Sequence, residues 1–438
     1  MKVCVQGLWH LGSVTAACLA SVGFEVVGLD PVALTVANLA QGKAPLFEPG
    51  LDELLQAGIA SGKLTFSSDA AQSVSSAAVL WVTFDTPVDD EDQADVAFVQ
   101  NQIQAALPHL ADGAVVLVSS QMPVGSIRKL ENFASQHVPG KLLGFACSPE
   151  NLRLGKALDV FLSPDRIVVG VRNAETRQVL ERLLTPVTNR VEWMSVESAE
   201  MTKHAINAFL ATSVTFVNEI AAICELVGAD AKEVERGLKT EARIGPKAYV
   251  SPGGPFAGGT LARDIAFLGI ESQAHNLSTP LLSAVRPSND EHKNWVRRKL
   301  LQEFHTINGL TVAIWGLTYK PGTDTLRRSL AVELCDWLLA QGAKLQVYDP
   351  EVKQIPERWV GKLVHCTGAM PAVEGASALV VGTEWPQFKQ SATDLVNCVK
   401  SGFTVIDANR HLQSLATAFR DAGFKYVAVG TPAESEVC

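Results

Sequence analysis

The sequence lacks the features that mark nucleic-acid-binding, membrane-surface and disordered proteins. Its 37 Lys and Arg residues are outnumbered by 46 Asp and Glu residues, and the formal net charge of −9 provides no basic field for nucleic acid or anionic lipid. Only 19% of the 438 residues are charged and 47% are hydrophobic, which is typical of a folded globular protein of two or three domains. Any phosphate-binding site must therefore be built locally, from backbone amides and a few cations.

The chain also lacks the cysteine patterns of metal sites and the usual sign of export. Its eight cysteines show no C-x-x-C or zinc-site spacing, and most lie in apolar runs, which indicates free, buried thiols in a reducing compartment and no metal. The N-terminal residues predict a strand, not a signal peptide. The most apolar stretch, residues 205–227, contains Asn207, Asn218, Glu219 and Glu225, which disfavours a membrane span. We therefore expect a cytoplasmic protein that contacts neither membrane nor nucleic acid.

Strand and helix patterns alternate over the first 200 or so residues. The opening strand Lys2–Gln6, helix Ser13–Val22 and strand Phe24–Asp30 are typical of a nucleotide-binding parallel sheet. Further strands are expected at Val79–Thr83, Ala114–Val118, Leu142–Ala146 and Arg166–Val171. We expect a Rossmann-type dinucleotide-binding domain over residues 1–197.

The remaining sequence predicts a helical domain and then a second α/β domain. Glu197–Gly228 reads as one helix, far longer than the average of about 11–12 residues. Its apolar residues occupy more than one face, so it forms either a dimer seam or a spine buried against its own chain. Later elements are expected at Thr311–Trp315, Ser329–Gln341, Lys344–Tyr348, Ala378–Val381 and Thr404–Asp407. We expect an α/β protein with a central helical dimerisation domain, residues 198–300, and a C-terminal Rossmann-like domain, residues 301–438.

A glycine fingerprint with one glycine replaced follows the first strand. In Gly7–Gly12 (GLWHLG) the first glycine permits a tight turn and the last permits close helix–strand packing. The middle glycine, which lets a pyrophosphate approach the backbone, is replaced by Trp9. Asp30 ends the second strand, where a carboxylate binds both ribose hydroxyls and repels a 2′-phosphate. This pattern predicts NAD rather than NADP.

A second interpretation of the same residues is a Rossmann domain that has lost its cofactor, with Trp9 filling the pocket. The free amides at the helix N-terminus and Asp30 argue against that loss. His10 lines the predicted cleft, and we assign it no catalytic role.

A long series of short motifs runs along the chain. In order they are 41–51 (QGKAPLFEPGL), 86–87 (TP), 123–125 (PVG), 148–150 (SPE), 166–170 (RIVVG), 199–203 (AEMTK), 243–245 (RIG), 252–264 (PGGPFAGGTLARD), 316–320 (GLTYK) and 383–386 (TEWP). This order resembles the UDP-glucose/GDP-mannose dehydrogenase family over nearly the whole chain. The resemblance implies an NAD domain, a dimer-forming helical domain and a C-terminal domain for the UDP-like half of a nucleotide sugar. The implied cofactor site comprises Gly7, Trp9, His10, Leu11, Gly12, Asp30, Thr86 and Pro87.

The resemblance also implies roles for residues in the reacting site. Lys203 and Asn207 lie one helical turn apart on one face, and in the family this pair stabilises an oxyanion on the substrate. An exposed lysine beside an exposed asparagine is the alternative. Asp264 matches the family carboxylate that positions or activates water, and Glu150 is also retained.

Several catalytic positions depart from the family pattern. The position of the family's covalent cysteine holds Thr260, and that of its lysine holds Arg263. A threonine hydroxyl is a far weaker nucleophile than a thiolate. Leu154 replaces an acid/base glutamate, and Gln121 replaces a threonine near the catalytic water. The changed groups serve aldehyde capture and hydrolysis, whereas the retained ones serve alcohol oxidation.

Substrate residues carried over from the family lie in the glycine-rich segment and the last domain. Lys320 and Arg327 match positions near the nucleotide diphosphate, and both cation types suit phosphate. For Arg327, a surface ion pair with Asp324 is the alternative. Arg243 matches an arginine that reaches the sugar in the partner subunit. The predicted substrate site comprises Arg243, Tyr249, Gly253, Phe256, Gly259, Lys320 and Arg327.

Three functional hypotheses remain open. The preferred one is an NAD-dependent oxidoreductase that makes one two-electron hydride transfer on a nucleotide sugar, giving an aldehyde or ketone or serving a redox epimerisation. The second is oxidation of the C6 alcohol of UDP-glucose to the acid without a thioester. The third is a catalytically silent protein that binds a nucleotide sugar.

Overall fold

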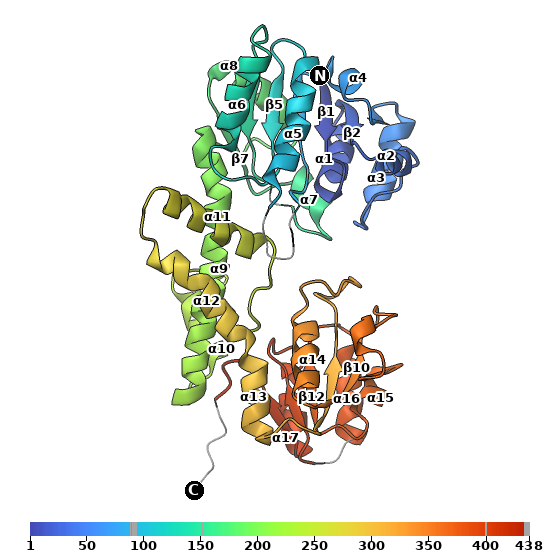
Figure 1. Cartoon of the computed structure of the whole chain (residues 1–438), viewed down its shortest axis with the longest axis vertical. Coiled ribbons are helices and arrows are strands. Elements are labelled where there is room, and N and C mark those ends of the chain that lie inside the picture. The colour runs from blue at the N-terminus through green and yellow to red at the C-terminus, as the bar shows by residue number, and fades with distance from the viewer. Residues whose placement is uncertain (88, 90–93, 151, 399–400, 433–438) are drawn as a thin grey trace. The chain divides into compact units, whose positions relative to one another are not determined.

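The computed structural model describes residues 1–87, 89, 94–150, 152–398 and 401–432. Two compact units make up the chain, residues 1–206 and residues 207–438 (Figure 1). The long helix α9 (Val196–Val227) begins in the first unit and ends in the second. The three-domain boundaries at residues 197 and 300 stay a prediction.

The first unit is built on an eight-stranded sheet, counted over the described residues, with the order β3-β2-β1-β4-β5-β6-β7-β8. The strands are β1 (Lys2–Gln6), β2 (Glu25–Leu29), β3 (Leu64–Ser67), β4 (Val79–Val82), β5 (Val115–Val118), β6 (Gly144–Cys147), β7 (Ile167–Val171) and β8 (Val191–Met194). Neighbouring strands are parallel, except that β6 and β7 are antiparallel. The strand order reverses beside β1, which is where open parallel sheets bind ligands at the carboxyl ends of their strands.

Both faces of this sheet are buried, which is why its strands read as continuous apolar runs. Along β1, Val3 and Val5 join one apolar cluster while Cys4 joins the other. The first cluster includes residues of α1 (His10–Ser21) and α3 (Leu51–Ala60), and the second includes residues of α5 (Val96–Ala106) and α6 (Ser126–His137). Helices therefore cover the sheet on both sides and leave its carboxyl edge for the site.

The second unit begins with a group of helices. They are the later part of α9, α10 (Ala231–Thr240), α11 (Thr260–Ala274), α12 (Pro280–Lys293) and α13 (Trp295–Phe304). Ala208 and Ala211 of α9 form one apolar cluster with Ile265 of α11 and Val285 of α12. This cluster packs α11 and α12 against α9.

A six-stranded parallel sheet, again counted over the described residues, completes the second unit. Its order is β11-β10-β9-β12-β13-β14. The strands are β9 (Thr311–Trp315), β10 (Lys344–Tyr348), β11 (Val364–His365), β12 (Ala378–Val381), β13 (Thr404–Ile406) and β14 (Lys425–Val427). Val312 and Ile314 face one apolar cluster and Ala313 and Trp315 the other. The architecture confirms the predicted fold: two Rossmann-like sheets with a helical region and a long helix.

Some element ends differ from the sequence-based expectation. The first helix begins at His10 rather than Ser13, because the glycine turn is short and leads directly into it. The strand expected at Leu142–Ala146 spans Gly144–Cys147 instead. Leu142 is exposed and its amide bonds to the Asp112 side chain, so it belongs to the preceding loop.

Helix α9 is the one described helix that is long and apolar enough to cross a membrane, by length and composition only. Within its most apolar window 44% is buried inside the structure. Its polar residues are also used internally, since Asn218 bonds to the backbone of Gly253 and Glu225 accepts from the Trp295 indole. The packing therefore favours the interpretation of α9 as a structural helix.

Candidate active site

The turn between β1 and α1 has the close packing of a dinucleotide-binding turn. Gly7 has φ +93°, and a Cβ there would lie 2.6 Å from the Phe84 ring. A Cβ on Gly12 would lie 1.8 Å from the Gly7 carbonyl oxygen, so only glycine fits. Helix α1 starts without a side-chain cap, which leaves its first amides available to an anion.

Asp30 lies just beyond β2, as predicted for the ribose carboxylate. It is 7% exposed, and its two oxygens accept from the amides of Leu8 and Val32 at 2.8 and 2.9 Å. These amides hold the carboxylate at the mouth of the glycine turn. A buried carboxylate in this position fits a ribose diol and disfavours a 2′-phosphate.

Trp9 and His10 differ in how they are held. The Trp9 side chain is half exposed beside the first turn of α1. His10 Nε2 lies 2.9 Å from Glu48 Oε2, and Glu48 also accepts from the amides of Gly155 and Ala157. Burial opposes ionisation of Glu48, but these hydrogen bonds together hold its pKa below the usual value. His10 is thus a structural contact, consistent with no catalytic role.

Thr86 and Pro87 follow β4 at the same edge. The Thr86 hydroxyl donates to the Gln121 carbonyl at 2.6 Å, which links the ends of β4 and β5. Pro87 is exposed and its carbonyl accepts from the Asp95 amide. Leu11 is buried in the first turn of α1. The glycines, Asp30 and the uncapped helix fit NAD, and Trp9 is the exception among these residues.

A cavity beside the ends of β5 and β6 contains two of the predicted catalytic residues. Its lining includes Ser120, Cys147, Glu150, Glu200, Lys203 and His204. Lys203 Nζ donates to the Glu150 carbonyl at 2.7 Å and lies 3.6 Å from Glu150 Oε1. The Lys203 side chain is 13% exposed, so the solvated-lysine alternative does not describe it. A cation held this way can stabilise an oxyanion in the cavity.

The wall of this cavity includes residues that sequence reasoning did not assign. Glu200 accepts from the amides of Gly125 and Ile127 at 2.7 and 2.9 Å, and so anchors the start of α6 against α9. Burial raises the pKa of Glu200 despite these two bonds. The Ser120 hydroxyl oxygen is buried there without a hydrogen-bond partner. The only sequence signal was the position of these residues within the matched motifs.

Cys147 also lines the cavity, so its thiol is a candidate to act as the nucleophile in place of the family's cysteine. It is 7% exposed, and burial, aided by the Glu200 charge, raises the pKa of its thiol well above the usual value. A nucleophilic cysteine needs a lowered pKa. The side chains of Cys398 and Cys438 lie outside the described residues.

Asn207 and Asp264 form a buried pair in the second unit. The Asn207 amide donates to Asp264 Oδ2, and Asp264 is fully buried. Thr260 is exposed one turn before Asp264, at the first position of α11. Thr260 and Asp264 are thus one turn apart on α11, and the buried Asn207 is not the exposed asparagine of the alternative interpretation.

Four side chains hold the glycine-rich segment, and sequence reasoning missed them. Asn218 accepts from the Gly253 amide, Asn409 from the Gly254 amide and Asn289 from the Phe256 amide. His292 Nε2 lies 2.8 Å from the Gly253 carbonyl. Burial lowers the pKa of His292, which keeps the ring neutral. Gly259 ends the segment with φ +95°, which favours glycine.

The second sheet resembles the first in having an aspartate, Asp349, just after its second strand, but the contacts of that aspartate differ from those of Asp30. Asp349 Oδ2 accepts from the amides of Leu317 and Thr318 and from the Trp385 indole. Its other oxygen accepts from the Glu351 and Val352 amides. Unlike Asp30, Asp349 also bonds to the Trp385 indole and the Thr318 hydroxyl, so its side chain is engaged by other side chains of this sheet.

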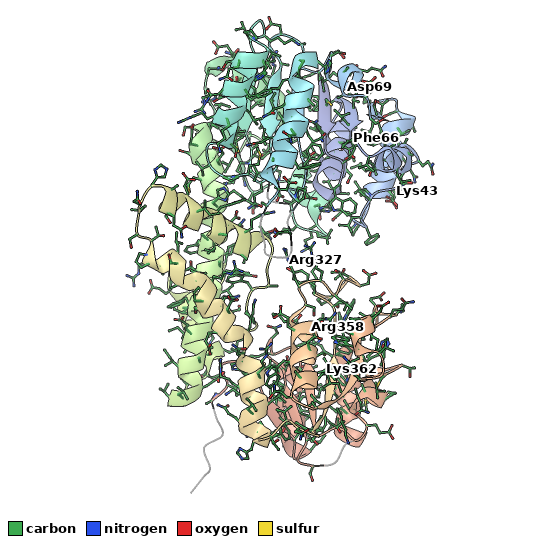
Figure 2. The ribbon with its side chains drawn as sticks, viewed as in Figure 1. Lys43, Phe66, Asp69, Arg327, Arg358 and Lys362 are labelled. Carbon is green, nitrogen blue, oxygen red and sulfur yellow. The ribbon has the colours of Figure 1, made fainter. Side chains whose placement is uncertain are left out.

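The remaining predicted substrate residues are exposed in the second unit. Lys320 lies on the loop after β9. Arg327, which is labelled in Figure 2, precedes the N-cap Ser329 of α14 (Leu330–Ala340). Arg327 is therefore on the loop just before the helix. Arg243 is 87% exposed and pairs with Glu241, and Tyr249 is 58% exposed. Their roles stay predictions.

Three domain matches span most of the chain. The NAD-binding domain of the UDP-glucose/GDP-mannose dehydrogenase family matches residues 1–188, its central domain residues 197–291 and its UDP-binding domain residues 313–414. UDP-glucose 6-dehydrogenase of Pseudomonas aeruginosa is 31% identical over 99% of this chain and 98% of that protein. The enzyme of that name from Rhizobium meliloti is 31% identical over 99% and 100% of the two chains.

Solved structures show the same fold. A UDP-glucose dehydrogenase from Pyrobaculum islandicum matches with a TM-score of 0.84 and 25% identity, over 99% of this chain and 98% of that one. A UDP-D-ManNAc dehydrogenase from Pyrococcus horikoshii matches in fold with the same TM-score at 22% identity, over 98% and 99% of the chains. With the fingerprint turn, Asp30 and the Lys203 cavity in place, the chain belongs to the UDP-glucose/GDP-mannose dehydrogenase family and is an NAD-dependent oxidoreductase of that family.

Proposed function

We propose that the protein oxidises a CH–OH group of a nucleotide-activated sugar, a UDP-sugar first of all, in a single two-electron step. NAD⁺, when bound, supplies the acceptor for the hydride. The substrate loses a hydride from carbon and a proton from oxygen, and the product is an aldehyde or a ketone. The observation that carries the proposal is the mostly buried Lys203 in its cavity together with the buried Asn207–Asp264 pair. The expected position of Thr260, where the resemblance implies a thiol in the family, supports the two-electron step.

Lys203 and Asn207 would hold the oxygen of the reacting alcohol. They are one turn apart on α9, and one brings an ammonium group and the other an amide. The ammonium stabilises the negative charge that develops as the carbon loses hydride. Asp264 bonds to Asn207 and would orient this amide and take part in proton transfer.

Thr260 would line the substrate site and offer its hydroxyl for a hydrogen bond, rather than act as a nucleophile. Its hydroxyl needs a base to become reactive. The buried Asp264 already accepts from Asn207. Covalent capture of an aldehyde is therefore not expected, and the second hydride transfer that depends on it is lost.

The test is the stoichiometry of NADH formed per nucleotide sugar consumed, with products identified by mass spectrometry. The relatives described above are named UDP-glucose 6-dehydrogenases, so UDP-glucose is the first sugar to test. One NADH per sugar and a carbonyl product are expected. Two NADH and a uronate would instead establish oxidation to the acid, through an aldehyde hydrate. Nucleotide-sugar binding without NAD binding would establish the silent binding protein.

The proposed active form is a homodimer assembled through α9, in a cytoplasmic setting. Phe209, Phe216 and Ile223 recur at every seventh residue of this helix and are 69%, 47% and 55% exposed. Leu226 extends the same stripe at 87% exposure. A heptad-spaced apolar stripe on an exposed helix fits a second helix of the same kind. Arg243 would then be free to reach the partner's sugar.

A further inference from the structure

Trp9 stands where the chain passes from the glycine turn into α1. Its side chain is 50% exposed, and it belongs to neither of the apolar clusters that the described residues of the first unit form. Its backbone is extended, with φ −76° and ψ −152°, which any residue can adopt. Neither the core nor the backbone therefore explains a tryptophan at this position.

The space beside Trp9 is the place where a dinucleotide's pyrophosphate meets the helix. The first amides of α1 have no side-chain cap, and the glycine turn before them is intact. In such turns the middle residue is glycine because the pyrophosphate must come close to the backbone. An indole at that position obstructs the approach.

The first turn of α1 is held by contacts on both sides. His10, the next residue, is held at 2.9 Å by Glu48, which is itself fixed by the amides of Gly155 and Ala157. On the other side, Gly12 packs directly against the Gly7 carbonyl. These contacts hold the first turn of α1 in place, so an indole beside it leaves less room for a pyrophosphate at the helix amides.

We propose that Trp9 sets the affinity for the dinucleotide by keeping its pyrophosphate away from the amides of α1. The cofactor is then held mainly through its adenosine half, at Asp30, and exchanges after each turnover. This inference rests on the proposed function in taking NAD as the ligand. It deepens that function, because rapid exchange suits a dehydrogenase and does not suit an epimerase that must retain its NADH.

The test is calorimetric binding of NAD, ADP-ribose and adenosine to the full-length wild type and to Trp9→Gly. The substitution should tighten binding of NAD and ADP-ribose by about tenfold or more, because the pyrophosphate gains the helix amides. Adenosine, which has no pyrophosphate, should bind both proteins equally. Trp9→Phe, which keeps a bulky ring, is the matched control and should bind like the wild type.

The inference is overturned if Trp9→Gly binds NAD no more tightly than the wild type, or if adenosine binding changes as much as NAD binding. Unfolding midpoints measured for all variants show whether each is folded. If Trp9→Gly is not folded, Trp9→Ala takes its place, because it also removes the indole. Failure of the proposed function looks different: neither protein would then reduce NAD with any nucleotide sugar. If the wild type reduces NAD and Trp9→Gly binds NAD with the same affinity as the wild type, only the role of Trp9 is refuted and the proposed function stands.

Discussion

Thr260 is the residue on which the chemistry depends. It provides a hydroxyl at the exposed start of α11, one turn before the buried Asp264. Among the described residues, the candidate for a replacement thiol is Cys147, which lines the Lys203 cavity but is buried with a raised pKa. A protonated, buried thiol does not attack a carbonyl, so we expect a reaction that does not involve sulfur.

Alkylation tests this expectation. Treatment of the wild type with N-ethylmaleimide should leave NADH formation unchanged, since no thiol takes part. Thr260→Cys should lose activity on the same treatment, because its thiol would be exposed at a helix N-terminus, which favours the thiolate. Thr260→Ser is the matched control and should resist the reagent. Inactivation of the wild type that Cys147→Ser abolishes would contradict the account and identify Cys147 as the nucleophile.

The Asn207–Asp264 pair should contribute to stability as well as to the reaction. Asn207→Ala removes a donor from a fully buried carboxylate, which costs on the order of 1–3 kcal/mol. Urea unfolding measures the change. Asn207→Asp should be more harmful, because it places two acids together, whereas Asp264→Asn keeps the shape and should lose activity with a smaller loss of stability. Equal stability of wild type and Asn207→Ala would show that the pair is not formed.

At the scale of elements, the glycine-rich segment depends on neighbouring helices for its shape. Glu235 of α10 accepts from Lys232 and Lys239, each at 2.6 Å, and from the Ser251 hydroxyl at the start of the segment. Burial opposes its ionisation, but these three bonds together lower the pKa of Glu235 to about 2. The ionised carboxylate thus ties α10 to Ser251, and protonation weakens this link.

This link predicts a pH-dependent loss of stability in Glu235→Gln. The pKa of Glu235 is lower in the folded protein than in the unfolded chain. Its contribution to the free energy of unfolding is therefore fully present above about pH 4.5 and is lost as the pH falls toward 2. Urea unfolding should give Glu235→Gln a free energy of unfolding roughly 1–2 kcal/mol below that of the wild type at pH 7. This difference should shrink progressively below about pH 4.5. Glu233→Gln on the same helix is the control, since its pair with Arg236 is exposed and worth little. A deficit that stays constant with pH would rule out the charge as its cause.

Helix α9 is the predicted interface of the homodimer. Phe216→Glu places a charge in the middle of the exposed apolar stripe and should convert a dimer into a monomer. Light scattering coupled to size exclusion measures the mass. Leu142→Glu, at a residue that is 81% exposed in the first unit, is the control and should leave the dimer intact. A monomeric wild type, or a Phe216→Glu variant that remains a dimer, contradicts the proposed interface.

For the whole molecule, the sequence predicted the fold well where local patterns decide it. The strands Lys2–Gln6, Thr311–Trp315, Lys344–Tyr348 and Ala378–Val381 were predicted to the residue, since each is an apolar run between turn residues. Periodicity and the glycine fingerprint are local properties. The start of α1 and the position of β6 were missed because turn length and loop hydrogen bonds determine them.

The supporting contacts of the site were beyond prediction for a physical reason. Glu200 binds amides of α6 from more than seventy positions away, and Asn409 reaches Gly254 from still farther along the chain. No periodicity links such residues, and only the folded chain brings them together. The catalytic candidates themselves came from motif order, which also predicts that Thr260 stands at the thiol position.

The central claim is that the site removes one hydride from its sugar and cannot trap the product on sulfur. The most direct measurement is the number of NADH molecules formed per nucleotide sugar consumed by the wild type, with the product identified by mass spectrometry. The account predicts one NADH and an aldehyde or ketone. Two NADH with a uronate, or a covalent adduct of the product on any cysteine, would contradict it.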